Sequence, residues 1–264
     1  MQNIHESAII EKGAVIGENV SVGAYAYIGS GVSIGKNTSV GHSTHIEGLT
    51  SIGEDNKIFP FASIGTAPQD LKYAGEPTRL QIGDRNTFRE FCQVNLGTVQ
   101  GGGVTKIAND CLFMGHTHIA HDCVIGDRVI VANLVALAGH VEIGEFSVIG
   151  GLSAVHQFVK IGRFAMVAGA SALSQDAPPF SLVEGNRAYV RGLNLVGLRR
   201  HFDHSAIDEL KTAFKEIFRK DHAPKSAAER LLLGELSVEA RELCEFIVES
   251  RRGIPHKSEN LEEV

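Results

Sequence analysis

The side chains best suited to chemistry gather in one short segment, Gly115–Asp122, which reads GHTHIAHD. It holds three histidines and an aspartate, and two further histidines follow at His140 and His156. Because a histidine ordinarily titrates at about pH 6.5, much of its imidazole is neutral near neutral pH and can accept a proton. Such a group suits metal binding, activation of a nucleophile, or general-base catalysis on an alcohol.

The elements that position this segment can be predicted from apolar residues that recur at every sixth position of the chain. An aliphatic residue or phenylalanine at every sixth position fits neither a helix nor one long strand and is typical of a parallel β-helix. The next residue is often glycine, which we interpret as the need of a tight corner. Three such units make a triangular coil of 18 residues, and about eight coils span roughly 40 Å. The periodic positions are Ile10, Ile16, Val22, Ile28, Ile34, Val40, Ile46, Ile52, Ile58, Ile64, Ile82, Phe88, Val94, Ile107, Phe113, Ile119, Ile125, Val131, Leu137, Ile143, Ile149, Val155, Ile161, Val167 and Leu173.

Two insertions and a change of pattern near the C-terminus interrupt the period. Residues 66–81 and 95–106 fall between repeats, and insertions in repeat folds become loops on one face, often the binding face. The sequence thus predicts a mainly β chain, with a parallel β-helix over 1–186 and a C-terminal helical domain over 187–264. We expect helices near 204–220, capped by Asp203 or Ser205, from a capping box at 226–229, and over 238–250. The tail after Gly253 is polar and is expected to be loose.

Composition narrows the class of protein. The 264 residues are 43% hydrophobic and include 29 glycines, as suits a turn-rich globular chain, and the net charge of −6 argues against general nucleic-acid binding. Between Arg187 and Arg230, ten Lys and Arg stand against six Asp and Glu, which favours either a solvated face or an acidic partner. Without a basic-then-apolar leader or a long apolar run, we expect a cytoplasmic protein with no stable membrane insertion.

General-base catalysis would centre on His121. It lies two places after Ile119, at a flank of the repeat, and Gly139 occupies the same place one coil further on, with His140 beside it. A base next to a backbone N–H that carries no side chain could combine proton abstraction with oxyanion stabilisation. From the pattern alone, a surface histidine without a function explains His121 equally well.

Metal binding is the second possibility. The spacing of His116 and His121 matches two zinc ligands of gamma-class carbonic anhydrases, which also have six-residue repeats. Those enzymes need a third histidine upstream, and the window Gly75–Glu90 has none. His118 does not replace it easily, because successive strand residues point in opposite directions.

Nucleophilic catalysis is the third possibility, and the cysteines do not support it. Cys92, Cys111 and Cys123 occupy the column of small residues that follows each aliphatic position by four places. The chain has four cysteines and no CxxC spacing, so packing in the core is the expected role.

Motifs along nearly the whole chain resemble those of the acyl-[acyl-carrier-protein]–UDP-N-acetylglucosamine O-acyltransferases, the hexapeptide-repeat family that begins lipid A synthesis. The QDLKY loop together with HIAHD is the most specific part. The motifs are QDLKYAGEPTR at Gln69–Arg79, GTVQGGG at Gly97–Gly103, HIAHD at His118–Asp122, AGH at Ala138–His140, VHQF at Val155–Phe158 and GLRR at Gly197–Arg200.

The resemblance implies a left-handed coil, a homotrimer with a cleft between neighbouring prisms, and a 3-hydroxyacyl donor on acyl carrier protein. It implies His121 as general base, Asp122 as supporting carboxylate, the Gly139 N–H as oxyanion donor, and Gly169 as the residue that sets acyl length. It implies no metal and no resident cofactor, since the phosphopantetheine arrives on the carrier. The residues implied to line the cleft are Asp70, Lys72, His118, His140, Gln157, Asn194 and Arg200.

Three departures from the family pattern concern substrate contacts rather than the base. Many relatives read HRGT where this chain has NLGT from Asn95, often carry Glu at the position of Val196, and lack His116. The rival functions are the related UDP-3-O-acylglucosamine N-acyltransferase, which has an extra domain before its repeats, a gamma-type zinc hydratase, and a bare solenoid scaffold. A scaffold would leave the two long loops without a purpose.

Overall fold

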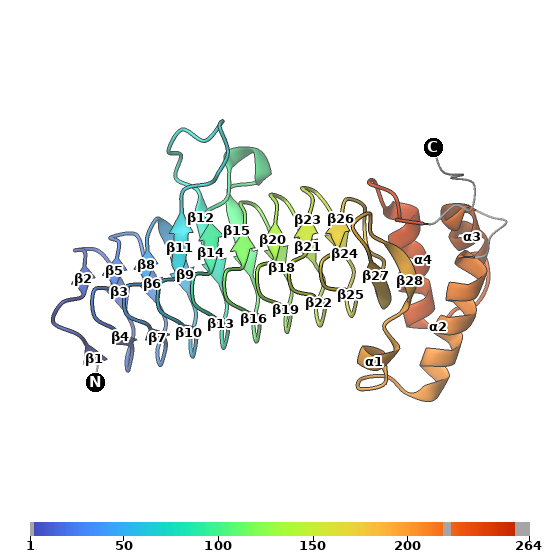
Figure 1. The fold of residues 1–264 in the computed structure, drawn as a ribbon, viewed down its shortest axis with the longest axis horizontal. Helices are drawn as coiled ribbons and strands as arrows, with labels where there is room; N and C mark the ends of the chain where they lie inside the picture. The colour runs from blue at the N-terminus through green and yellow to red at the C-terminus, as the bar shows by residue number, and fades with distance from the viewer. Residues whose placement is uncertain (1–2, 219–222, 257–264) are drawn as a thin grey trace.

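The computed structural model describes residues 3–218 and 223–256. From Asn3 to Leu173 the chain winds as a left-handed parallel β-helix, a triangular prism whose three walls are stacks of short parallel strands (Figure 1). Most strands have two residues and pair with the strand 18 positions later, as Ile10 does with Ile28. Where loops intervene the separation grows, so that Ile58 pairs with Phe88.

Each coil passes through the three walls, sheets A, B and C, in that order. Sheet A contains β1 (Asn3–Ile4), β4 (Ser21–Val22), β7 (Ser39–Val40), β10 (Lys57–Ile58), β13 (Thr87–Phe88), β16 (Leu112–Phe113), β19 (Ile130–Val131), β22 (Val148–Ile149), β25 (Met166–Val167), β27 (Ser181–Glu184) and β28 (Tyr189–Leu193). Sheet B contains β2 (Ile9–Ile10), β5 (Tyr27–Ile28), β8 (His45–Ile46), β11 (Ser63–Thr66), β14 (Gln93–Asn95), β17 (His118–Ile119), β20 (Ala136–Leu137), β23 (Ala154–Val155) and β26 (Ala172–Leu173). Sheet C contains β3 (Val15–Ile16), β6 (Ser33–Ile34), β9 (Leu49–Ile52), β12 (Arg79–Ile82), β15 (Val104–Ile107), β18 (Val124–Ile125), β21 (Glu142–Ile143) and β24 (Lys160–Ile161).

The six-residue period arises because one residue of each short strand points into the prism. Ile28, Ile46, Ile64 and Ile119 are fully buried and belong to one continuous core. Burying each such side chain stabilises the fold by about 1.5–3 kcal/mol. The prediction of a parallel β-helix is confirmed.

The corners between the walls are built differently from the sequence-based expectation. The left-handed backbone conformation occurs at the third residue after the buried one, for example φ 59° at Asn37 and 61° at Asp122. The glycines stand two places earlier, where a Cβ at Gly23 or Gly35 would come within 2.5 Å of the backbone of the next coil. Close approach of neighbouring coils, not a positive φ, therefore explains this glycine column.

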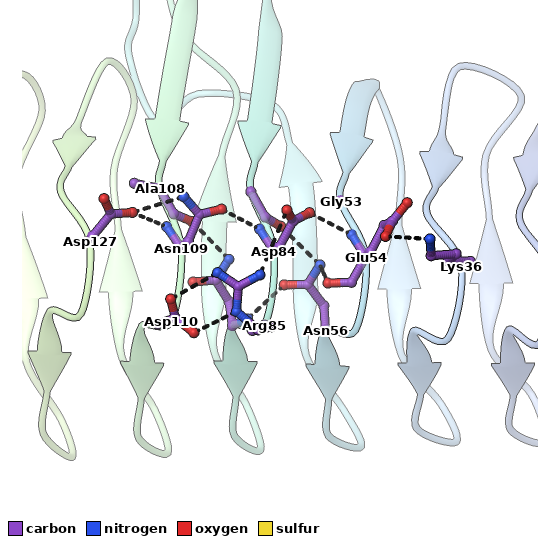
Figure 2. A network of polar contacts seen from close by, with 12 residues as sticks. Lys36, Gly53, Glu54, Asn56, Asp84, Arg85, Ala108, Asn109, Asp110 and Asp127 are labelled. Carbon is purple, nitrogen blue, oxygen red and sulfur yellow. Dashed lines mark hydrogen bonds and ion pairs between the residues drawn. The ribbon is translucent and has the colours of Figure 1, made fainter.

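Side chains at the corner between sheets C and A, the C–A corner, link successive coils (Figure 2). Glu54 N–H donates to Asp84 Oδ1, Asp84 N–H to Asn109 Oδ1, and Asn109 N–H to Asp127 Oδ1, each at 2.8 Å. We call Glu54, Asp84, Asn109 and Asp127 the polar ladder. It gives each of these donors a partner and so fixes the coils relative to one another.

Both insertions leave the corner between sheets B and C, the B–C corner, and project side by side from that edge of the prism (Figure 1). The first loop spans residues 67–78 and the second, with the 3-10 helix η1 (Val99–Gly101), spans 96–103. They are shorter than the predicted 66–81 and 95–106, because Arg79–Ile82 pairs with Val104–Ile107 and extends the strands on sheet C. Two consecutive coils thus place their loops at one edge.

The C-terminal segment caps the prism with α1 (Leu195–Leu198), α2 (His204–Ile217), α3 (Pro224–Leu231) and α4 (Val238–Glu249). Phe180, Leu198, Leu210 and Leu243 form its separate core. None of the helices in the described residues is long and apolar enough to cross a membrane.

Four sequence expectations about this segment meet different outcomes. Asp203 caps α2 by accepting from Ala206 N–H, as predicted. The predicted capping box at 226–229 is wrong, because α3 already begins at Pro224. Proline is favoured at the first position of a helix because its fixed φ is already helical. The boundary at 186 falls inside the antiparallel β27–β28 hairpin, which extends sheet A. The tail is not loose at its start, since Val190 N–H donates to Pro255 O, and residues 257–264 lie outside the described part.

Candidate active site

His121 and Asp122 form a hydrogen-bonded pair at the B–C corner, directly after β17. The His121 Nδ1 lies 2.8 Å from Asp122 Oδ2, and the two side chains are 12% and 1% exposed. An ionised carboxylate only accepts, so in the neutral imidazole Nδ1 carries the proton and Nε2 keeps a free lone pair. The pair is therefore arranged as a base supported by a carboxylate.

The buried Asp122 is held by the second loop and by sheet C. Its oxygens accept from Thr98 N–H at 2.8 Å and from Thr98 Oγ1 at 2.6 Å, and its own N–H donates to Thr105 Oγ1 at 2.8 Å. The turn at Asp122 is left-handed, with φ 61°. These bonds supply the partners that a buried charge needs.

Gly139 lies under the imidazole, one coil beyond His121. A Cβ at Gly139 would lie 2.5 Å from His121 Cε1 and 2.7 Å from Nε2, so only glycine lets the ring rest there. Gly139 is buried, its carbonyl accepts from Phe158 N–H, and within residues 3–218 and 223–256 its own N–H has no acceptor. A buried donor without a partner, beside a base, suits stabilisation of an oxyanion.

His140 completes a stack of rings at this edge. It meets His121 edge-to-face, with centroids 5.1 Å apart, and stacks on Phe158 at 4.3 Å. Its Nε2 lies 3.8 Å from Asp122 Oδ2. Burial lowers the pKa of His140 below 6.5, and the Asp122 carboxylate opposes this shift only in part. His140 therefore favours the neutral form.

The first loop returns onto sheet B beside the pair. Gln69 Nε2 donates to Gln93 Oε1 at 3.4 Å, and the same oxygen lies 3.2 Å from Nδ1 of His118. Burial lowers the pKa of His118 below 6.5. Asp70 accepts from Lys72 N–H at 2.9 Å, and its charge favours the protonated form of His140, while the Lys72 side chain is exposed. Asp70, Lys72 and His118 thus lie on the same side of the prism as His121.

The remaining predicted site residues are divided among the corners. Gln157 is exposed one coil beyond Gly139, at the same corner. Asn194 caps α1 at the C–A corner, where Nδ2 donates to Phe164 O and Oδ1 accepts from Gly197 N–H. The exposed Arg200 follows α1, and Gly169 lies at the A–B corner after β25. One protomer alone therefore does not bring Asn194, Arg200 or Gly169 to His121.

The positions that depart from the family pattern lie in three different places. Asn95 is fully buried, and its Nδ2 donates to Thr66 Oγ1 and Ala67 O, which fixes the base of the first loop. Val196 is 66% exposed on α1. His116 lies at the A–B corner, stacked on Phe91 with centroids 4.7 Å apart. The zinc-type pair of His116 and His121 is thus not assembled within one protomer.

His121, Asp122 and His140 are the group of described side chains that could approach a common metal ion, since one potential ligand atom of each lies within 4.8 Å of the others. Both Asp122 oxygens, however, already accept hydrogen bonds from Thr98 and His121. Coordination through His121 Nδ1 would break the bond to Asp122. We therefore interpret the three as a hydrogen-bonded set rather than as ligands.

Cys92, Cys111 and Cys123 are core residues, as their positions in the repeat predict. All four cysteines are free and buried. Burial raises the pKa of the Cys92 and Cys111 thiols to about 11 and that of Cys123 to about 12. Since the thiolate is the nucleophile, these residues are unsuited to nucleophilic catalysis at neutral pH.

Thr98 and Thr105, which hold Asp122, were not among the predicted site residues. The available signal was the position of Thr98 in an insertion rich in glycine, GTVQGGG. Its contact with Asp122 joins residues 24 apart in sequence, and no local pattern predicts that distance.

Comparisons with known proteins identify the family of this chain. Residues 176–255 match the family model "Udp N-acetylglucosamine O-acyltransferase; Domain 2", and 3–36, 13–48 and 105–139 match the bacterial transferase hexapeptide model. The chain is 56% identical over 255 residues to the acyl-[acyl-carrier-protein]–UDP-N-acetylglucosamine O-acyltransferase of Sulfurovum sp. and 51% identical over 256 residues to that of Aliarcobacter butzleri, each alignment covering 97% of this chain and 98% of the relative. The solved UDP-N-acetylglucosamine acyltransferase of Campylobacter jejuni is 46% identical, with a TM-score of 0.93 over 97% of this chain and 100% of that one. This chain belongs to the UDP-N-acetylglucosamine O-acyltransferase family.

Proposed function

We propose that this enzyme transfers a 3-hydroxyacyl chain from acyl carrier protein to the 3-oxygen of the glucosamine in UDP-N-acetylglucosamine, the first step of lipid A synthesis. The observation that carries the proposal is the His121–Asp122 pair beside Gly139, whose N–H has no acceptor among the described residues. The relatives named for this reaction align along 97% of the chain.

In the proposed reaction His121 Nε2 takes the proton of the sugar 3-hydroxyl as that oxygen attacks the thioester carbon. The Gly139 N–H stabilises the tetrahedral oxyanion, a contribution typically worth about 3–4 kcal/mol where measured in other enzymes. The intermediate collapses by breaking the C–S bond, and the imidazolium returns its proton to the departing thiolate. His121 and Gly139 supply these steps without a resident cofactor, because the phosphopantetheine belongs to the carrier protein.

The working assembly is a homotrimer with each cleft between neighbouring prisms. Asn194, Arg200 and Gly169 lie at other corners than His121, so a second copy is needed to bring such groups into one cleft. An apolar ridge along the A–B corner, formed by Tyr25, Phe61, Phe91, Leu134 and Leu152, is 46–75% exposed in one protomer, as suits contact with another chain. Sedimentation equilibrium should give three times the protomer mass, and a monomeric mass would contradict the assembly.

Gly169 sets the length of the accepted acyl chain in this proposal. A Cβ there would meet Gly151 O at 3.3 Å, so the position is narrow but carries no side chain to block a groove. Each buried methylene is worth about 0.8 kcal/mol, so an open groove favours a donor with on the order of 14 carbons rather than 10. In competition between donors of mixed length, Gly169→Met should shift the preference toward short chains. A preference of the unaltered enzyme for 10-carbon donors would assign the limit to another residue.

The acidic carrier protein is proposed to dock on the basic stretch 187–230. Arg199 and Lys215 are exposed there, whereas Lys211 is already paired with Asp208 at 2.8 Å. Reversing Arg199 or Lys215 to Glu should raise the KM for carrier-bound donor about threefold, and added salt should reduce this difference. Kinetics insensitive to both changes would place the docking site elsewhere. We place the reaction in the cytoplasm, which cell fractionation tests.

The decisive experiment incubates purified protein with UDP-N-acetylglucosamine and a mixed pool of 3-hydroxyacyl carrier proteins, with the product identified by mass spectrometry. A product carrying one ester-linked hydroxyacyl group on the 3-oxygen is expected. Offering the 3-amino analogue in parallel shows which acceptor is preferred. A third reaction offers the 3-O-acylated sugar with a free 2-amino group, and acylation of that acceptor alone would instead identify the N-acyltransferase reaction.

A further inference from the structure

The second loop folds directly onto Asp122, the carboxylate that supports His121 in the proposed reaction. Thr98, 1% exposed, donates its backbone N–H to Asp122 Oδ1 and approaches Oδ2 with its Oγ1 at 2.6 Å. A Cβ at Gly101 would overlap the Asp122 carboxyl group, so the first turn of the loop lies against the carboxylate without a side chain between them.

The direction of the Thr98 hydroxyl proton follows from its second bond. Gly101 N–H donates to Thr98 Oγ1 at 3.2 Å, as expected of a helix-capping threonine. The hydroxyl has one proton, and the ionised carboxylate can only accept, so that proton points to Asp122 Oδ2. The same oxygen also accepts from His121 Nδ1 at 2.8 Å. Thr98, Asp122 and His121 thus form a chain with a defined polarity.

We propose that Thr98 is a positioning residue for the general base. Its two donors fix the carboxylate plane of Asp122, and the carboxylate in turn holds the proton of His121 on Nδ1 and directs Nε2 outward. The hydroxyl also draws part of the negative charge on Oδ2, which moderates how strongly Asp122 stabilises the imidazolium. This inference rests on the proposed function, because it assigns the base of that reaction its support.

Among the described residues, four other titratable groups face this chain. His140 of the next coil lies 3.8 Å from Asp122 Oδ2, His118 lies on β17, Asp70 lies on the first loop, and the buried Cys123 thiol follows Asp122 directly. A change confined to the Thr98 hydroxyl leaves all four in place, so its effect on pH dependence can be assigned.

Thr98→Val isolates the hydroxyl, because valine keeps the branched shape and the backbone N–H. We expect kcat to fall about tenfold, since the lost hydrogen bond is one to a charged group and its loss weakens the support of the base. KM for both substrates should stay within about twofold. The acid limb of the pH–kcat profile should move to higher pH, because the less solvated carboxylate stabilises the imidazolium more. Thr98→Ser, which restores the hydroxyl, should return both quantities toward those of the unaltered enzyme.

The matched control is Thr117→Val, a buried threonine of the A–B corner whose Oγ1 donates to Met114 O at 2.6 Å. This variant should keep the original kcat and pH profile. A Thr98→Val enzyme with unchanged kcat and profile would overturn the proposal. A loss of kcat without a shift, and not restored by serine, would equally overturn it by showing a role only in loop folding.

Imidazole ¹⁵N NMR of His121 gives a readout that needs no reaction. In the unaltered protein the signals should show the proton on Nδ1, and in Thr98→Val the titration should move upward in pH. Should the unaltered protein transfer no acyl group, the proposed function fails while this titration still decides the role of Thr98. An unmoved titration would refute that role even in an active enzyme.

Discussion

The C–A and B–C corners of the prism share one backbone turn but use its second residue in different ways. Both have a left-handed third residue, with φ 57° at Arg85 and 61° at Asp122. At the C–A corner the second residue caps the N–H of the preceding coil, as Asn109 does for Asp84. At the B–C corner Gly139 has no side chain, and its N–H stays unpartnered among the described residues. The first corner pairs its polar groups between coils, and the second leaves an imidazole and a backbone donor available for the proposed chemistry.

The charged side chains of the two corners also differ in how deeply they are buried. The Arg85–Asp110 ion pair of the C–A corner has side chains 53% and 33% exposed, and such pairs contribute about 0–1 kcal/mol. Asp122 is 1% exposed and receives donors from Thr98 and His121. A buried carboxylate keeps its neighbours in fixed positions, which an exposed pair does not do. The difference between the corners can be tested by substitutions at matched positions.

The largest effect is expected at the base. His121→Ala should lower turnover by at least roughly a hundredfold, the usual scale for loss of a general base. The change removes a flank side chain and no core residue, so the assembly should persist. Steady-state kinetics and solution mass measure the two quantities. Turnover close to that of the unaltered enzyme, in an intact assembly, would remove His121 from the role of base.

The next largest effect is expected at Gly139, the second residue of the turn at the B–C corner. Gly139→Ala would place a methyl group 2.5 Å from His121 Cε1, so the imidazole must move. A displacement of about 1 Å can cost on the order of a hundredfold in rate, and we expect kcat to fall by at least about tenfold. Gly115→Ala is the control, since it is the second residue of the A–B corner and its Cβ would meet nothing nearer than 3.3 Å. Equal kinetics for the two variants would show that the glycine is not required by the ring.

Substitutions in the polar ladder of the C–A corner should lower the stability of the fold rather than the activity. Asn109→Ala removes the acceptor for Asp84 N–H at the partly buried ladder, at a cost of about 1–2 kcal/mol in the free energy of unfolding. Gln157→Ala, at the exposed second position of the B–C corner, should change that free energy by about 0.5 kcal/mol or less. Urea unfolding of both variants measures the contrast. A larger cost at Gln157 than at Asn109 would reverse the comparison.

The smallest effect is on the pH dependence of stability. Burial lowers the pKa of His118 and His140 below 6.5, so the unfolded chain binds more protons than the folded one just below that pH. Their contribution is therefore fully present above pH 6.5 and is lost as the pH falls toward the lowered values. The free energy of unfolding should fall from pH 7 to 5.5, and His118→Gln should make this fall less steep. An identical slope in the variant would mean that His118 does not take part.

Sequence alone predicted the coil, its core and the candidate site residues at the edge from which both insertions project. The aliphatic period, the two insertions and HIAHD all have local causes, because each short strand must bury one side chain and each insertion must leave the coil where the period breaks. The fold class and the family are confirmed, and the roles of His121, Asp122 and Gly139 stay predictions. The capping box at 226–229 failed, because a proline two residues earlier already began the helix.

Only the tertiary structure decided how these parts meet. The glycine column exists because neighbouring coils approach closely, and the contact of Thr98 with Asp122 joins an insertion to a corner 24 residues away. The division of His121, Asn194 and Gly169 among three corners also depends on which wall each repeat enters. A six-residue period fixes which side chain points inward, since that depends on neighbours along the chain. Contacts across coils and loops depend on the whole winding, which no short stretch of sequence contains.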